Sequence, residues 1–358
     1  MLKRRFAARL RRSGVDRDAK DRFLSFLESL YARGVDYRNR RLDGEGACMR
    51  LPLPVISVGN LVVGGTGKTP MVRFLARFLE EKGLRAAILS RGYGGRLEKE
   101  GGRVSDGEEI FLCAAEAGDE PVLLAKTCRA AVYVGANRYA SGLRAMEEGA
   151  EVLILDDGFQ HRKLYRDLDL VLLDARAPLG NGRLLPRGSL RERPQALRRA
   201  HALVLTHCGE KGGMDPRVLT EFREGSGLPV FPTSHRQVAW PGKGALAEEV
   251  TGERVLAFAG IADGRGFAQS LEASGWIVLH TEIFDDHHAY TSRDIRQLVA
   301  KARTLGAQAL VTTAKDAVKL PNPECWPLPL RVRDVELVFG DREAFHSWLE
   351  SRLSPFFS

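Results

Sequence analysis

A glycine-rich loop between a predicted strand and a predicted helix constrains this chain more than any other feature. The loop follows an apolar run at residues 54–58 and precedes an amphipathic pattern at residues 70–81. Its residues are Gly64, Gly65, Thr66, Gly67, Lys68 and Thr69. Glycines let successive backbone N–H groups turn toward an anion, and the N-terminus of the following helix adds partial positive charge. The pattern therefore predicts a P-loop that binds the phosphates of a nucleotide.

The last two residues of this loop have the side chains that phosphate chemistry needs. Lys68 is expected to reach the β- and γ-phosphates, and the Thr69 hydroxyl to bind Mg²⁺. Val62 stands where the G-x-x-x-x-G-K-[ST] pattern has its first glycine, so the loop is closer to the G-G-x-G-K-T variant. A merely structural glycine turn does not explain why a lysine and a threonine follow directly.

An acidic pair supplies the second half of the predicted nucleotide site. The apolar run at residues 152–155 ends in Asp156 and Asp157. In P-loop proteins an acidic residue at the end of a buried strand holds Mg²⁺, directly or through water. We expect one of the two carboxylates to do this, and the other to orient the ion or to contact the substrate.

Short apolar runs alternate with amphipathic helical patterns along most of the chain. The predicted strands lie at residues 54–58, 86–90, 131–134, 152–155, 168–173, 202–205, 255–258, 276–279 and 309–312. This alternation predicts an α/β fold, with a P-loop NTPase-like parallel sheet and helices on both faces. A stretch rich in glycine and proline at residues 209–255 indicates a break, after which a second, smaller α/β domain is expected.

Three regions follow from this pattern. We expect a basic, amphipathic N-terminal helical segment at residues 1–50, the P-loop domain at 51–225 and the smaller α/β domain at 226–358. The first region holds 14 lysine or arginine residues against 7 acidic ones, and the whole chain has a net charge of +8. A basic end attracts polyanions, either nucleic acid or an anionic membrane surface.

The N-terminal segment combines this charge with one apolar face. The face is formed by Phe23, Leu24, Phe26, Leu27, Leu30 and Tyr31, and arginines lie before or beside it at positions 4, 5, 9, 11, 12 and 22. Such a segment can lie in a bilayer interface. It can equally be a helix that packs on the core and carries a solvated basic tail. The sequence leaves both interpretations open.

The cysteines and the apolar runs indicate where the protein works. Five cysteines are widely spaced without a C-x-x-C pair, which is typical of a reducing compartment and not of a disulfide framework or a cysteine zinc site. The chain shows neither a signal-peptide pattern nor a membrane-spanning apolar run. We therefore expect a cytoplasmic protein that can touch a membrane only from one side.

Six ordered motifs carry a resemblance to a known family. They occupy residues 54–70, 89–94, 116–121, 155–161, 182–192 and 312–316. The fourth motif is Leu-Asp-Asp-Gly-Phe-Gln-His at 155–161, and the fifth is Gly-Arg-Leu-Leu-Pro-Arg-Gly-Ser-Leu-Arg-Glu at 182–192. In this order they resemble the tetraacyldisaccharide 4'-kinases, also called lipid A 4'-kinases, from about residue 20 to about residue 320.

The resemblance implies a reaction and its surroundings. ATP would phosphorylate the 4'-hydroxyl of tetraacyldisaccharide 1-phosphate to give lipid IVA in lipid A biosynthesis, with Mg²⁺ as the metal. The enzyme would be peripheral on the cytoplasmic side of the bacterial inner membrane. Its partners would be the lipid substrate and that membrane face, and no nucleic acid.

The resemblance also implies residue roles. Asp119 would be the general base, paired with His287, although His288 follows directly and leaves the working histidine open. Lys68 would act on the phosphates, and Thr69, Asp156 and Asp157 at the metal. Substrate-contacting or supporting positions would be Arg138, Gln160, Arg191 and Glu192. The motif at 312–316 has Ala314 where the family has a glutamate, so no role is carried over to that position.

Plainer interpretations remain for the supporting residues. Gln160 and His161 can cap the turn after a strand, Arg191 and Glu192 can form a solvated surface pair, and Lys315 and Asp316 can be purely structural. A G-protein-like assembly NTPase is an alternative function, because the loop variant also occurs there, but residues 313–316 lack the asparagine of N-K-x-D. GTP preference without lipid dependence would favour that class. A nucleic-acid binder would leave the loop and the acidic pair without a purpose.

Overall fold

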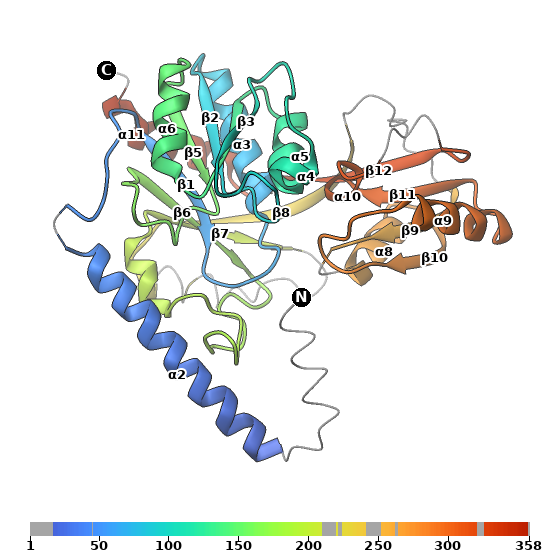
Figure 1. The fold of residues 1–358 in the computed structure, drawn as a ribbon, viewed down its shortest axis with the longest axis horizontal. Coiled ribbons are helices and arrows are strands. Elements are labelled where there is room, and N and C mark those ends of the chain that lie inside the picture. Colours follow the sequence, from blue (N-terminus) through green and yellow to red (C-terminus); the bar gives the residue numbers. More distant parts are fainter. Residues whose placement is uncertain are drawn as a thin grey trace.

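A curled sheet of twelve strands forms the centre of the protein in this computed structural model (Figure 1). The structure describes residues 17–44, 46–209, 220, 224–240, 252–261, 264–320 and 326–356. The strands are β1 (Val55–Asn60), β2 (Ala86–Ser90), β3 (Gly102–Ser105), β4 (Ala131–Val134), β5 (Val152–Asp156), β6 (Leu168–Asp174), β7 (Ala202–Thr206), β8 (Val230–Ala239), β9 (Arg254–Ala259), β10 (Ile277–Ile283), β11 (Ala309–Thr313) and β12 (Leu330–Phe339). Their order is β10-β9-β11-β12-β8-β7-β6-β1-β5-β2-β4-β3.

The sheet is mostly parallel, which confirms the predicted fold class. Among the strands that the structure describes, only the β3–β4 and β8–β12 pairs are antiparallel. All residues of β1, β2, β5 and β7 are buried, as expected for strands covered on both faces. The apolar runs predicted as strands are therefore strands in the structure, with ends that shift by one or a few residues.

Helices cover both faces of the sheet. They are α2 (Arg17–Leu42), α3 (Lys68–Glu81), α4 (Ala114–Ala117), α5 (Asp119–Thr127), α6 (Arg138–Glu147), α8 (Gly264–Ala273), α9 (Ser292–Thr304), α10 (Ala314–Ala317) and α11 (Arg342–Leu353). Side chains of α3 and α5 pack in one core with alternate residues of β1 and β2, such as Ile56 and Ile88. Ala145 of α6 packs with their neighbours, such as Val55 and Ala87, on the opposite face. The period of two along each strand thus divides the core into two layers.

β8 joins the P-loop part of the sheet to the strands that follow it. This strand lies in the stretch from which a break was predicted, and its residues 230–239 pair with β7 on one side and β12 on the other. Most of the remaining stretch lies outside the described residues. After β12 the chain returns to the P-loop part of the molecule. There Phe345 of α11 packs on Phe74 of α3, with their ring centroids 5.7 Å apart.

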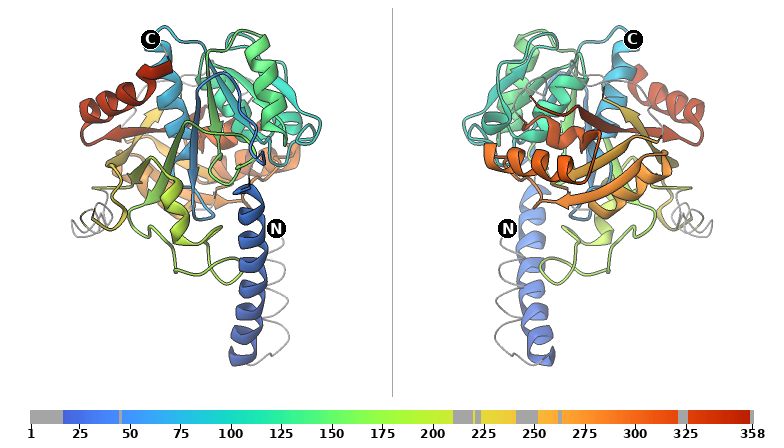
Figure 2. Two further views of the ribbon diagram at one scale, coloured as in Figure 1. Left: turned by 90° about the vertical axis from the view of Figure 1, so that its left-hand side faces the viewer. Right: turned by 90° about the vertical axis from the view of Figure 1, so that its right-hand side faces the viewer.

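The first described helix, α2, extends from the body of the molecule (Figures 1 and 2). It is held where the Tyr31 hydroxyl donates to the Arg191 carbonyl at 3.0 Å and where Glu28 Oε1 accepts from the Leu184 backbone N–H at 2.9 Å. Phe26 and Leu30 of its predicted apolar face remain 64% and 57% exposed. Of the described helices, none combines the length and the apolar character that crossing a bilayer needs. The basic positions 4, 5, 9, 11 and 12 lie outside the described residues.

Candidate active site

The glycine-rich loop forms a tight turn that ends at the N-terminus of α3. Gly67 caps this helix with φ of 81°, in the left-handed region that favours glycine. A Cβ atom at this position would lie 2.8 Å from His235 Nε2, so a side chain here would also require the His235 ring to shift. Thr66 is buried and accepts a hydrogen bond from the Asn60 side chain at 2.9 Å, which ties the loop to the end of β1. The loop is therefore preshaped as an anion cradle at a helix N-terminus.

Lys68 opens α3 and faces the acidic pair. Its Nζ lies 3.7 Å from Asp157 Oδ1. Arg191 Nη1 donates to both oxygens of Asp157, at 2.8 and 2.7 Å. Burial on its own would raise the pKa of Asp157, but the positive charges of Lys68 and Arg191 lower the pKa below its ordinary value. Asp157 is thus a charged carboxylate that gathers two cations at the mouth of the phosphate cradle.

Asp156 lies in a different environment, at the buried end of β5. Its side chain accepts a hydrogen bond from the Ser90 hydroxyl at 3.1 Å. Burial, together with the negative charges of Glu120 and Asp157, raises the pKa of Asp156 to about 7. A buried carboxylate in this condition gains from a cation, and Thr69 adds a hydroxyl at the same pocket. This set of hard oxygen donors fits Mg²⁺, which keeps several waters and substrate phosphates as its other ligands.

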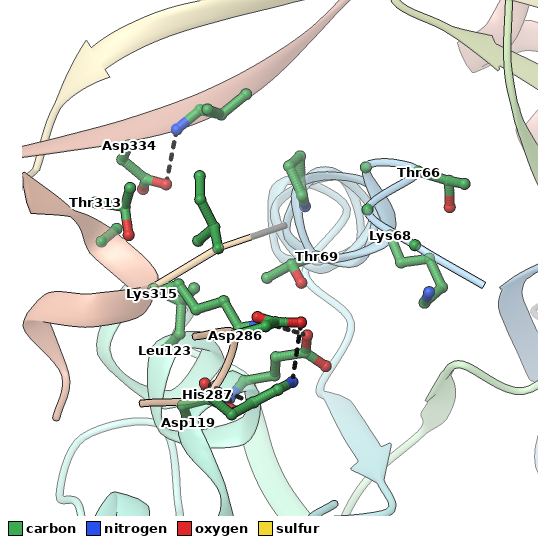
Figure 3. A pocket seen from close by; sticks show the side chains of 18 of the residues that line it. Thr66, Lys68, Thr69, Asp119, Leu123, Asp286, His287, Thr313, Lys315 and Asp334 are labelled. Atoms are coloured by element: carbon green, nitrogen blue, oxygen red, sulfur yellow. Dashed lines mark hydrogen bonds and ion pairs between the residues drawn. The ribbon is translucent and has the colours of Figure 1, made fainter. Parts of the chain in front are cut away.

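Asp119 and His287 meet across the same pocket, although 168 positions separate them (Figure 3). Asp119 is the first residue of α5, and His287 lies in the loop between β10 and α9. His287 Nδ1 lies 3.1 Å from Oδ1 and 3.0 Å from Oδ2 of Asp119. Burial would raise the pKa of Asp119, yet the hydrogen bond from His287 and nearby lysine charges lower it. The same hydrogen bond raises the pKa of His287.

The neighbouring histidine has another partner. His288 Nε2 lies 3.2 Å from Asp294 Oδ2, at the start of α9, and its ring stacks on Phe284 with centroids 4.6 Å apart. His287 adopts a φ of 62°, in the left-handed region that residues other than glycine rarely occupy. The geometry thus separates the two histidines that the sequence left equivalent.

The supporting residues fall into two groups. Arg138, Gln160 and Arg191 line the pocket together with Asp119 and Lys68. Gln160 donates from Nε2 to the Asn60 carbonyl at 2.9 Å, and its Oε1 accepts from Arg191 Nη1 at 3.3 Å. Arg138 is buried and donates to the Gly135 carbonyl at 3.0 Å. Gln160 therefore links the end of β1 to the Asp157–Arg191 pair and does more than cap a turn.

Glu192 takes a different place, beneath α2 and away from the pocket lining. Arg199 donates to both of its oxygens, at 3.0 and 3.1 Å, and the Asn39 side chain donates at 2.9 Å. Its side chain is 1% exposed, so the alternative of a solvated Arg191–Glu192 surface pair does not describe the structure. Glu192 holds the loop that carries Arg191 against α2.

Two lysines lie near Asp119: sequence reasoning gave Lys315 a structural interpretation, and it did not single out Lys319. Lys315 Nζ lies 3.3 Å from Glu120 Oε1 and 3.5 Å from Asp286 Oδ1, as Figure 3 shows for Asp286. Lys319 Nζ lies 4.0 Å from Asp119 Oδ2. A signal was present in the spacing, because lysines four residues apart in a helical segment share one face.

Comparisons with known proteins agree with one another. The family model for tetraacyldisaccharide-1-P 4'-kinase matches residues 20–354. The tetraacyldisaccharide 4'-kinase of Geobacter metallireducens is 49% identical over 76% of this chain and 80% of its own length. That of Syntrophus aciditrophicus is 41% identical over 92% of both chains. A solved structure, LpxK from Aquifex aeolicus in complex with ATP, is 33% identical, covers 94% of this chain and 98% of its own, and superposes with a TM-score of 0.76.

Proposed function

Since the chain belongs to the tetraacyldisaccharide-1-P 4'-kinase family, we propose that it transfers the γ-phosphate of ATP to the 4'-hydroxyl of tetraacyldisaccharide 1-phosphate, forming lipid IVA in lipid A biosynthesis. One observation supports this most directly. A phosphate cradle and an Asp–His pair with a buried carboxylate face a single pocket, and they come from distant parts of the sequence. A kinase needs both, since one binds the donor and the other takes a proton from the acceptor.

The donor side of the pocket is formed by the P-loop. The backbone N–H groups of residues 64–69 and the N-terminus of α3 would bind the phosphates, and Lys68 would leave Asp157 to reach the β- and γ-phosphates. Thr69 and Asp156 would hold Mg²⁺, with Asp157 supporting them. When bound, the ion neutralises charge that develops on the transferred phosphoryl group. Arg138 and Arg191 would add further positive charge at the same place.

The acceptor side is formed by Asp119 and His287. A sugar hydroxyl is a weak nucleophile, so a carboxylate that accepts its proton as the P–O bond forms lowers the barrier. Asp119 is ionised at neutral pH, because its pKa is lowered, and His287 fixes its orientation. In this assignment Asp119 is the general base and His287 its partner.

We also propose that residues 51–225 and 226–358 act as two units, already joined through β8 and α11, whose closer approach around the pocket completes the site. Asp119 belongs to the first unit and His287 to the second. Lys315 reaches Glu120 across the same boundary, at 3.3 Å. Closure over bound substrates would exclude water from the reacting phosphoryl group.

The lipid substrate requires contact with a membrane, and α2 offers a surface for it. Phe23, Phe26 and Leu30 are exposed on a helix that extends from the body, and the surrounding segment is basic. We propose that this helix lies in the interface of the cytoplasmic side of the inner membrane, where arginines meet anionic headgroups. A peripheral enzyme would in this way reach a substrate that stays in the bilayer.

Placing a charge on the exposed face of α2 is expected to weaken membrane binding. Phe26→Asp should reduce binding to vesicles that contain anionic lipid by about tenfold or more, because it removes ~2 kcal/mol of apolar burial and adds repulsion. The matched control is Phe111→Asp, at an aromatic side chain that is 43% exposed on a different surface. Equal vesicle sedimentation of the two variants would contradict the proposed role of α2.

A phosphate-transfer assay tests the proposed function as a whole. Labelled ATP, Mg²⁺ and detergent-dispersed tetraacyldisaccharide 1-phosphate are incubated with the protein, and the lipid is separated. Label in the lipid is the expected result. If ATP or GTP is hydrolysed while the lipid stays unlabelled, the chain is an NTPase of another class, and the assembly-factor alternative gains support.

A further inference from the structure

A buried lysine lies beside the Asp119–His287 pair and has no part in the function proposed so far. Lys319 follows α10, and its Nζ lies 2.9 Å from Asp316 Oδ1 and 4.0 Å from Asp119 Oδ2. The lysine side chain is 10% exposed, whereas those of Asp316 and Asp119 are 0% and 6% exposed. An ammonium group thus lies between two carboxylates that are almost completely removed from water, as an ion pair with Asp316 and at the longer distance of 4.0 Å from Asp119.

Residues in the C-terminal part of the chain fix the position of Lys319. Asp316 Oδ2 accepts hydrogen bonds from the Gly260 backbone N–H at 3.0 Å and from the Thr313 hydroxyl at 2.7 Å. Lys319 Nζ also lies 5.3 Å from the centre of the Tyr290 ring, within cation–π range. Asp316 therefore anchors Lys319, and Lys319 in turn presents its charge to Asp119.

Both oxygens of the Asp119 carboxylate have polar or charged neighbours. Oδ1 accepts from the Glu120 backbone N–H at 3.0 Å, and Oδ2 faces Lys319. His287 Nδ1 lies within hydrogen-bonding distance of both oxygens. The carboxylate thus has one backbone donor, one imidazole and one ammonium group around it, which together set its orientation.

Two further charged groups act on Asp119 beside Lys319. Lys315 is engaged by Glu120 and Asp286, at 3.3 and 3.5 Å. The hydrogen bond with Asp119 raises the pKa of His287, and the charge of His287 changes with pH. Without Lys319, Asp119 and Asp316 would be buried with no ammonium group between them, and burial with a like charge raises the pKa of a carboxyl group.

We propose that Lys319 is a positioning residue for the proton acceptor: anchored by Asp316, it keeps the Asp119 carboxylate charged and oriented toward His287. The inference rests on the proposed function, in which Asp119 takes the proton of the acceptor hydroxyl. Lys319 acts through Asp119 and not on the substrate. Burial raises the pKa of Asp119, but His287, Lys315 and Lys319 together lower it below its ordinary value, which is consistent with this role.

The test is the pH dependence of kcat/KM for lipid phosphorylation, which reports groups of the free enzyme. Activity requires ionised Asp119 and rises with pH through the pKa of this group. Removing a nearby positive charge raises the pKa of Asp119. In Lys319→Met the acidic limb, which is the low-pH side of the profile of kcat/KM against pH, should therefore move to higher pH by about one unit. Lys319→Arg, which keeps the charge, should restore the wild-type limb. Lys301→Met is the matched control, because Lys301 pairs with an exposed Glu282 at 2.8 Å.

A second variant separates positioning from folding. Lys319→Met leaves Asp316 buried without its cation, so Lys319→Met/Asp316→Asn removes both charges, and thermal unfolding identifies the variants that fold. A shifted acidic limb in the folded double variant supports the proposal. A limb that coincides with that of wild type, while Asp119→Asn is inactive, overturns the proposal and leaves the proposed function intact. An active Asp119→Asn overturns the base assignment and with it this inference.

Discussion

Lys68→Ala is expected to lower kcat/KM for phosphate transfer by about 10²–10³-fold, the usual effect of deleting one preorganised charge that stabilises a transition state. Lys68 is the first residue of α3, directly after the glycines of the cradle. Its ammonium group would bind the phosphates on which negative charge shifts during transfer. The measurement is initial-rate transfer of labelled phosphate to detergent-dispersed lipid.

The variant should still fold, which makes the loss interpretable. Asp157 keeps its two hydrogen bonds from Arg191 when Lys68 is shortened, and alanine is compatible with a helix start. Lys82→Ala is the control at the other end of α3, where Lys82 pairs with Glu350 at 2.6 Å on the surface. Equal activity of the two variants would mean that the cradle does not bind the reacting phosphates.

The parts of the fold that sequence reasoning predicted are those decided by local pattern. β1, β2 and β5 are short, mainly apolar runs bounded by turn residues, which is the local pattern of strands covered on both faces. β8 was missed because its sequence, VFPTSHRQVA, contains proline and polar residues. Pairing with β7 and β12 makes it a strand, and such tertiary context does not appear in a local window.

The site, like the fold, has features that the local sequence predicts and features that depend on tertiary contacts. The P-loop lies within six consecutive residues, so its chemistry was predictable from the residues themselves. The Asp119–His287 pair joins positions 168 apart, and only the family resemblance predicted it. Nothing in the sequence indicated that Arg191 binds Asp157 while Glu192, its neighbour, points to Arg199. Adjacent residues of an irregular loop can face opposite directions, and no periodicity reports which.

Asp119→Asn is expected to reduce kcat/KM by about 10²–10⁴-fold, the usual contribution of a positioned proton acceptor. Asparagine has nearly the same shape and can still accept the Glu120 backbone N–H, so the change removes basicity more than it removes structure. His287→Ala should also reduce activity, because it deletes the group that orients the carboxylate. Groups that act as a unit give non-additive losses, so the double variant should be little slower than Asp119→Asn alone.

A readout without turnover checks the same pair. The hydrogen bond to Asp119 raises the pKa of His287, so in Asp119→Asn the His287 imidazole should titrate at lower pH, as measured by its ring proton resonances. His288→Ala is the matched control, since His288 contacts Asp294 and should leave both the rate and this titration close to wild type. If His288→Ala is the slow variant and His287→Ala retains full activity, the pairing seen in the structure is not the one used in catalysis. A shift in the His287 titration together with full activity of Asp119→Asn would show a structural ion pair, and the proton of the acceptor hydroxyl would then have to leave by another group.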